Sequence, residues 1–127
     1  MIVFTIPRMR LVNTSNVREH WSKRAERAAT QRLAARTFAR RALDEHPMSP
    51  PYTCTITRIG PGKMDRSNIY VAAKAIEDGV CEALGIDDGD EAAWVLTTRQ
   101  ETPPKGSKGV NRYGVRVEIQ GGNDVER

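Results

Sequence analysis

The sequence has few of the residues that would tie a small fold together covalently or anchor it in a membrane. It holds two cysteines, Cys54 and Cys81, without the paired spacing of a metal-binding motif. We expect both to be buried free thiols in a reducing cytoplasm. No apolar run approaches the roughly 20 residues that span a membrane. The first ten residues, MIVFTIPRMR, are too alternating for a signal peptide and read as a strand.

Residues for nucleophilic catalysis and for nucleotide binding are also missing. The two histidines, His20 and His46, lie far in sequence from any Ser or Cys with supporting glycines. The stretch GPGKMD has too few glycines for a phosphate loop, and no Ser or Thr follows its lysine. DDGDE lacks the acidic spacing of a calcium-binding EF-hand. Carboxylates in predicted loops, among many basic groups, remain as the candidates for chemistry.

Hydrophobic periodicity predicts six elements in the 127 residues. Alternation predicts strands at 2–6, 52–59, 92–100 and 113–119, and helical spacing predicts helices at 17–43 and 68–84. Asn16 followed by Glu19 resembles a capping box for the first helix. The order β-α-β-α-β-β predicts an α+β fold, a mixed sheet with helices packed on it. We expect one domain over 1–120, a hairpin of the last two strands, and a disordered tail at 121–127.

The second predicted helix carries acidic residues at both of its ends. Its apolar face recurs at three- and four-residue steps, through Ile69, Ala73, Ile76, Val80 and Leu84. Ser67 or Asn68 can cap its start, and Gly85 suits the left-handed turn after its end. Asp65 precedes the helix, while Asp87, Asp88 and Asp90 follow it. Such loop carboxylates suit Mg²⁺, although a helix cap and a polar turn would need the same residues.

Basic residues crowd the first predicted helix and two loops, in a chain of net charge +4. Their functional interpretation is a surface that neutralises phosphates, and the alternative is a solvated face. The candidates for nucleic-acid binding are Lys23, Arg24, Arg27, Lys63, Arg66, Lys105 and Lys108.

The stretch MDRSN…AAKAIEDGVCEALGIDDGD resembles the signature of RusA-type Holliday junction resolvases. The basic N-terminal segment NTSNVREHWSKRAERAATQR resembles that of phage members. In that family an Asp-x-Asp-Asn begins a helix carrying a Lys and an Asp, and a glycine precedes an Asp-Asp pair. Asp65 matches the first acid, Asn68 the asparagine, and Asp87-Asp88 the closing pair. Lys74 and Asp78 keep the family's separation, one helical turn further from the asparagine.

The resemblance implies a RusA-like fold and a Mg²⁺-dependent endodeoxyribonuclease that resolves four-way DNA junctions in recombination and repair. It also implies a location in the cytoplasm of a bacterium or a phage-infected cell, and we expect a homodimer on the geometric grounds given below. The catalytic residues would be Asp65, Ser67, Lys74 and Asp88, and the metal ligands Asp65, Asp87 and Asp88.

Ser67 stands where the family has its second Asp, and this departure leaves open whether the chain is an active nuclease. A hydroxyl can ligate Mg²⁺ but adds no negative charge, so the chain can instead be an impaired relative that binds branched DNA as an accessory factor. The third alternative is an unrelated basic protein that binds RNA or a protein partner.

The length of the second predicted helix bears on how the acids meet. At 1.5 Å per residue, a helix over 68–84 is about 25 Å long. Asp65 and Asp88 of one chain would then be too far apart to share a metal, unless the backbone doubles back. A two-fold dimer with antiparallel copies of this helix would bring Asp65 of one subunit near Asp88 of the other.

Overall fold

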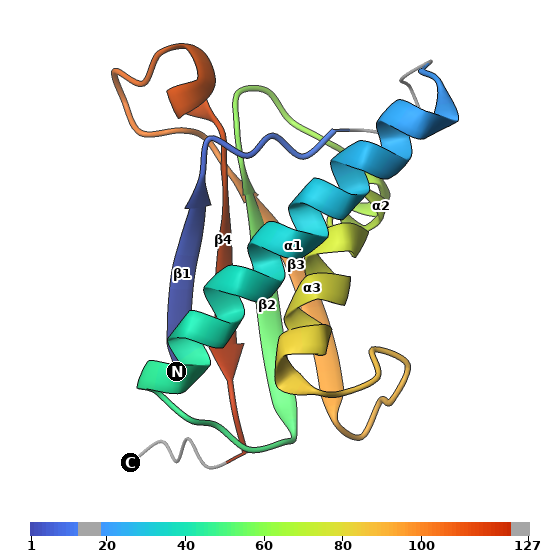
Figure 1. The fold of residues 1–127 in the computed structure, drawn as a ribbon. Coiled ribbons are helices and arrows are strands. Elements are labelled where there is room, and N and C mark those ends of the chain that lie inside the picture. Colours follow the sequence, from blue (N-terminus) through green and yellow to red (C-terminus); the bar gives the residue numbers. More distant parts are fainter. Residues whose placement is uncertain (13–18, 123–127) are drawn as a thin grey trace.

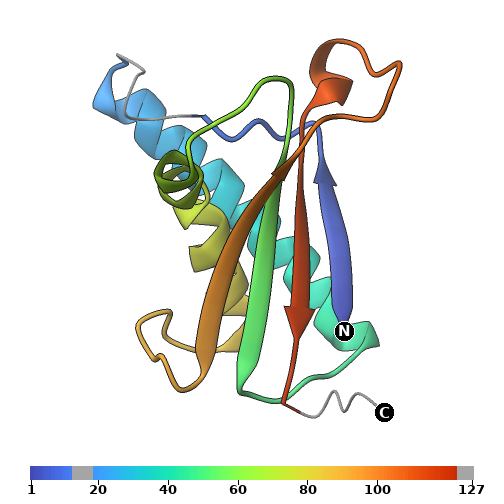
Figure 2. The same cartoon turned by 180° about the vertical axis from the view of Figure 1, so that it is seen from behind.

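One four-stranded sheet carries three helices on a single face. The computed structural model describes residues 1–12 and 19–122. Figures 1 and 2 show α1, α2 and α3 on the same side of the sheet, with the opposite face left open. The predicted α+β class with a mixed sheet is therefore confirmed. In chain order the elements are β1 (Ile2–Pro7), α1 (Trp21–Glu45), β2 (Tyr52–Ile59), α2 (Arg66–Ala72), α3 (Lys74–Leu84), β3 (Trp94–Glu101), the 3₁₀ turn η1 (Gly109–Arg112) and β4 (Gly114–Gln120).

The strands lie in the order β1-β4-β2-β3. β4 pairs antiparallel with both β1 and β2, whereas β2 and β3 are parallel, with Tyr52 opposite Trp94. The predicted hairpin of the last two strands is therefore wrong, because β2 lies between them. Alternation along a strand shows which residues face the core, but it does not name the neighbouring strand. The fully buried side chains of Val115, Val117 and Ile119 fit the central place of β4.

The first helix, α1, begins and ends later than the sequence pattern predicts. It starts at Trp21 after His20, whose Nδ1 accepts a hydrogen bond from the backbone N–H of Ser22 at 3.2 Å. The predicted cap Asn16 lies outside the described residues. Although α1 has 25 residues, neither it nor another helix of the described chain is apolar enough to cross a membrane.

The predicted domain end and the two cysteines are also placed by the structure. The backbone N–H of Gly122 donates to the carbonyl of Ser49 at 2.8 Å, and residues 123–127 lie outside the described part. Cys54 and Cys81 are buried free thiols, as expected. Burial raises the pKa of both, that of Cys81 to about 12, so neither is a ready nucleophile.

The predicted single helix at 68–84 is two helices, α2 and α3, separated at Ala73. This residue is fully buried and is both the C-cap of α2 and the N-cap of α3, with φ −87° and ψ −4°. The break contains neither proline nor glycine. It divides two helices with different partners, since α2 packs against β3 while α3 packs against α1. The predicted core positions Ile69 in α2 and Ile76 and Val80 in α3 are all buried.

The contact between α3 and α1 depends on a glycine. A Cβ atom on Gly79 would lie 2.3 Å from the carbonyl oxygen of Arg32 and 2.9 Å from the Cβ of Ala35. Both distances are shorter than van der Waals contact. On the facing side α1 presents the small, fully buried Ala35 and Ala39. The two helices therefore approach so closely that their backbones are in contact at Gly79.

We expect Gly79→Ala to destabilise the protein by about 1–3 kcal/mol, because α3 would have to move away from α1. Elsewhere in a helix the same substitution stabilises by about 0.5–1 kcal/mol. Urea denaturation of the two proteins measures the difference. A variant as stable as the wild type, or more so, would contradict the close approach.

Candidate functional site

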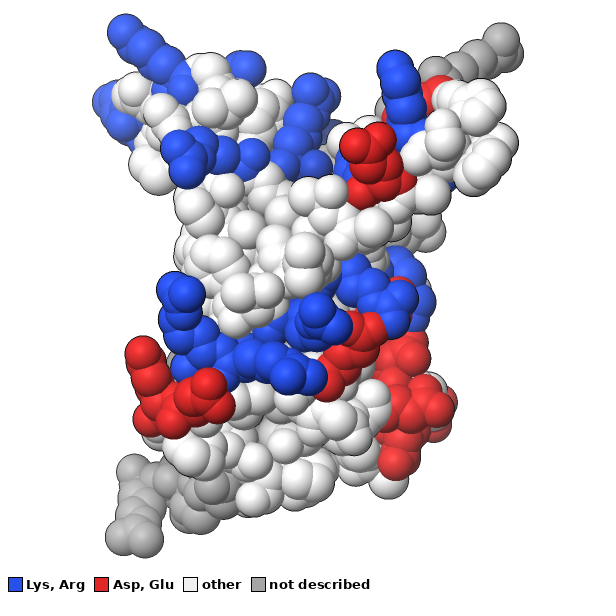
Figure 3. All heavy atoms as spheres, in the orientation of Figure 1, with Lys and Arg blue, Asp and Glu red and all other residues white. Residues whose placement is uncertain are grey.

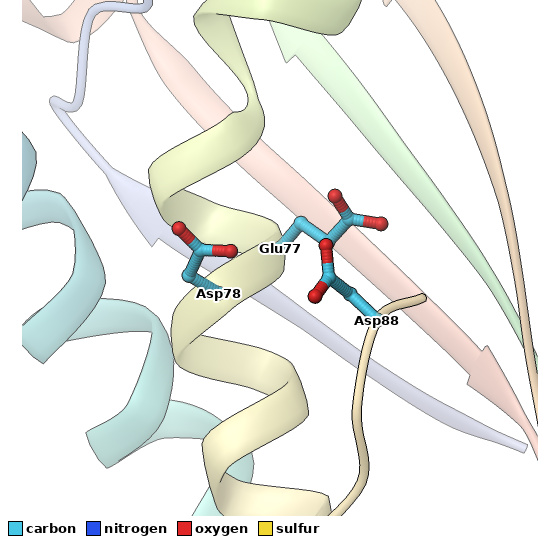
Figure 4. A group of neighbouring side chains, drawn as sticks. All are labelled: Glu77, Asp78 and Asp88. Atoms are coloured by element: carbon cyan, nitrogen blue, oxygen red, sulfur yellow. The ribbon is translucent and has the colours of Figure 1, made fainter. Parts of the chain in front are cut away.

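Three carboxylates converge beside the start of α3. Glu77 and Asp78 belong to α3, and Asp88 lies in the loop that follows it (Figure 4). Each offers an oxygen, and these oxygens all lie within 4.8 Å of one another. Among residues 1–12 and 19–122 this is the one such group of three acidic, His or Cys side chains. The group, called the acid cluster below, can hold a metal ion, and its carboxylate oxygens are ligands that hard cations prefer.

The turn after α3 brings Asp88 back to the helix. Gly85 ends α3 in the left-handed conformation, with φ 70° and ψ 32°, as the sequence predicts. The chain then reverses, and Asp88 lies against Lys74 in the first turn of α3. Asp87 points elsewhere, because its Oδ1 accepts a hydrogen bond from the backbone N–H of Gly89 at 2.9 Å. Of the closing acidic pair, the structure places Asp88 in the acid cluster and Asp87 in the loop.

Lys74 places its ammonium group among the three carboxylates. Its Nζ is 3.1 Å from Asp78 and 3.3 Å from Glu77, and it also pairs with Asp88. The spacing of three and four residues puts Lys74, Glu77 and Asp78 on one face of α3. The hydrogen bond to Asp88, with smaller contributions from Asp78 and Glu77, raises the pKa of Lys74. In turn, Lys74 lowers the pKa of the Asp88 carboxyl, so both groups are charged at neutral pH.

Glu77 is the buried member of the acid cluster, with 3% of its surface exposed. The indole Nε1 of Trp94, at the start of β3, donates a hydrogen bond to its Oε2 at 2.7 Å. Its other oxygen faces Lys74. A buried charge is tolerated when it is paired and hydrogen-bonded, and these two partners supply both. Sequence reasoning missed Glu77, although its position three residues after Lys74 on a predicted helix was a usable signal.

Asp65 and Ser67, at the start of α2, lie outside the acid cluster. Asp65 takes the N-cap position but makes no side-chain capping hydrogen bond. It is exposed and lines a shallow cavity of about 290 Å³ together with Arg58, Lys63 and Asn68. Ser67 lines a different groove, between α2 and β3. The structure thus does not gather the predicted ligands Asp65, Asp87 and Asp88 within one chain.

The loop after α3 turns back along the helix, so Asp88 lies nearer to Asp65 than the full length of α2 and α3 would place it. Asp88 contacts Lys74, nine residues after Asp65, rather than lying beyond the far end of the helix pair. At 1.5 Å per residue, those nine residues span about 13 Å. The doubling back that the sequence left open is therefore present, but it does not bring the two acids to a common metal.

The predicted nucleic-acid residues lie on α1, on α2 and in the loops that follow β2 and β3, and all but one of them are exposed. The half-buried one is Arg27, which makes two hydrogen bonds to the carboxylate of Glu19 at 2.9 and 2.5 Å and lowers its pKa. Arg24 lies 3.9 Å from the same carboxylate. Figure 3 shows Lys and Arg side chains at the top of the view and in a band across the middle of the molecule. The exposed candidates are Lys23, Arg24, Lys63, Arg66, Lys105 and Lys108.

Comparison of the chain with family models, with curated proteins and with solved structures finds no match. The RusA-like assignment therefore stays a prediction from the sequence.

The hydrogen bond between Trp94 and Glu77 should contribute measurably to stability. Trp94→Phe leaves a buried carboxylate one donor short, which costs about 1–3 kcal/mol. In a double-mutant cycle with Glu77→Met, we expect a coupling of about 0.5–3 kcal/mol, measured by urea denaturation. Additive effects would show that the two side chains are neighbours without a significant interaction.

Proposed function

We propose that this protein is a metal-dependent endodeoxyribonuclease that cuts four-way DNA junctions. The observation that carries the proposal is the acid cluster, in which Asp88 of the family-like signature meets Lys74 of the same signature. Two residues that are 14 positions apart in sequence, and that the resemblance assigns to catalysis, are in direct contact. The exposed basic residues support a polyanionic substrate.

The residues of the acid cluster fit Mg²⁺, the cofactor that the resemblance implies. Asp88 and Asp78 are the accessible ligands, and the buried Glu77 adds a third carboxylate. A bound Mg²⁺ would activate water and stabilise the charge that develops on a phosphodiester. Lys74 supplies a fixed positive charge beside the same oxygens, which suits it to orient a phosphate oxygen.

We further propose a two-fold homodimer, because Asp65 lies outside the acid cluster of its own chain. Antiparallel placement of α2 and α3 from two subunits would bring Asp65 of one near Asp88 of the other. Two equivalent sites would then serve the paired nicks that resolve a junction. Analytical ultracentrifugation tests the dimer, and a monomer at micromolar concentration would contradict it.

The second candidate function is an accessory protein that binds branched DNA without cutting it. The position of Ser67 favours it, since this residue replaces an acid and lines a groove that Asp65 does not. A synthetic four-way junction incubated with Mg²⁺ or with EDTA separates the two. Cleavage confined to the Mg²⁺ arm supports the nuclease, and binding in both arms without cleavage supports the accessory factor.

Asp88→Asn and Asp65→Asn should each abolish cleavage while junction binding is retained. Loss of a negative charge near DNA does not weaken phosphate contacts. Asp44→Asn, which removes an exposed acid at the far end of α1, is the matched control and should cut normally. A folded Asp88 or Asp65 variant that loses binding together with cleavage would indicate a structural role instead.

Ser67→Asp should raise cleavage at limiting Mg²⁺, because it restores the second carboxylate of the Asp-x-Asp-Asn pattern. Folding should not suffer, since an acid near a helix N-terminus is favoured by about 0.3–1 kcal/mol. Cleavage by the two proteins is measured across a Mg²⁺ titration. Superimposable curves would remove Ser67 from the active site.

A further inference from the structure

A second basic surface lies at the end of the sheet where β1 ends and β4 begins. Arg10 follows β1 and Arg112 precedes β4, and both guanidinium groups lie over the ring of Tyr113. Their Cζ atoms are 5.1 and 5.4 Å from the ring centroid. Neither arginine belongs to the basic set that the sequence predicts. This Arg10–Tyr113–Arg112 group comes from two segments that are about a hundred residues apart in sequence.

The turn that carries Arg10 is held in place from both sides. Arg8 has φ 60°, a left-handed conformation that non-glycine residues rarely adopt outside functional sites. Its backbone N–H donates to the carbonyl of Tyr113 at 2.9 Å. From α1, the buried amide of Gln31 donates to the carbonyl of Arg10 at 3.5 Å, and Leu11 is inserted into the core. The position of the Arg10 side chain is therefore prepared by the fold.

The two guanidinium groups have no carboxylate partner in the part of the chain that the structure describes. Other arginines do, since Arg116 pairs with Glu101 and Arg27 with Glu19. The Nε–H of Arg112 donates to the carbonyl of Gly109 at 3.1 Å. A guanidinium carries five N–H donors, so the others can still face an anion. Two like charges over one ring also repel each other, and an anion bound between them would relieve that repulsion. Phosphate oxygens match the forked donors of arginine.

A groove connects this group to the start of α1. Arg8, Met9 and Arg10 line one wall, and Lys23 and Arg27 stand on the other. Its volume is about 400 Å³, and Glu26 is the one acid among its lining residues. The groove thus extends the positive surface from Tyr113 toward Lys23, which the sequence assigns to phosphate binding.

We propose that Arg10 and Arg112, held on Tyr113, bind the sugar–phosphate backbone of DNA, and that the groove leads this backbone to Lys23. This inference rests on the proposed function for its choice of DNA as the partner. It adds a contact surface that is separate from the acid cluster and from α2.

The test uses the full chain with Arg10→Gln and Arg112→Gln combined, which removes two charges and keeps the side chains polar. Binding of a fluorescent four-way junction is followed by anisotropy in EDTA at several KCl concentrations. We expect the slope of log K against log[salt] to become shallower by about 1.8, because each lost phosphate contact contributes about 0.9. The matched control is Arg40→Gln with Arg41→Gln, two exposed arginines in the last turns of α1, and its slope should equal that of the wild type.

An unchanged slope, or an equal change in the control, would overturn the inference. Displacement of the junction by inorganic phosphate at matched ionic strength would also overturn it, since the site would then suit a small anion. Because EDTA prevents metal-dependent cleavage, the result does not depend on nuclease activity. If the wild type cuts the junction in Mg²⁺ but the double variant has an unchanged salt slope, only this inference is contradicted. If the salt slope of the double variant is shallower but the wild type does not cut in Mg²⁺, only the proposed nuclease is contradicted.

Discussion

Parallel pairing of β2 with β3 is the constraint on which the rest of the structure depends. A parallel pair requires the chain to return from the end of the first strand to the start of the second. α2, α3 and the loop after them make this return on one face of the sheet (Figure 1). Because Trp94 lies opposite Tyr52 in the register, the return places Trp94 at the start of β3, and its indole reaches Glu77 in the first turn of α3. The acid cluster is therefore a consequence of the crossover connection.

Charge balance in the acid cluster determines how a cation can enter it. The Lys74 ammonium already contacts all three carboxylates, and those contacts raise its pKa well above its usual range. Lys74 therefore stays protonated near neutral pH and does not leave the carboxylates by losing its charge. Asp88 has a lowered pKa, so it stays ionised until the pH falls below its usual value. A dication must compete with Lys74 for the same oxygens, and metal occupancy follows cation concentration more than the titration of either group.

The sequence predicts where the strands begin and end, but it predicts less well which elements lie next to one another in the fold. The four strands begin and end within two residues of the predicted bounds, because alternation directly reflects which side chains face the core. The hairpin prediction failed since strand order depends on contacts across the sheet, which no local pattern encodes. The break at Ala73 also escaped prediction, because it arises from the different packing partners of α2 and α3 rather than from a helix-breaking residue.

In the candidate site, too, some residues can be found from the sequence around them, whereas others are brought together only by the fold. Lys74, Asp78 and Asp88 were singled out through the resemblance, and the structure brings the three together. Glu77 was passed over because a charged residue on a helix is usually solvated, and its burial depends on Trp94, 17 residues away. Asp87 was assigned to the metal because it matches the first acid of the family's closing Asp-Asp pair, yet its carboxylate accepts a hydrogen bond from the backbone of its own turn.

The start of α2 and the start of α3 differ in local charge. Asp65 shares its cavity with Arg58 and Lys63, so the local field there opposes a dication and favours a phosphate. The guanidinium of Arg58 donates to the carbonyls of Pro61 and Gly62, which fixes that positive charge in place. Beside the start of α3, three carboxylates face one ammonium, and the field favours a cation. A polyanion held at the start of α2 and a metal held by the acid cluster would complement each other, and a reaction at their boundary requires the two to meet. The proposed homodimer would supply this meeting, because it would bring the start of α2 of one subunit to the acid cluster of the other.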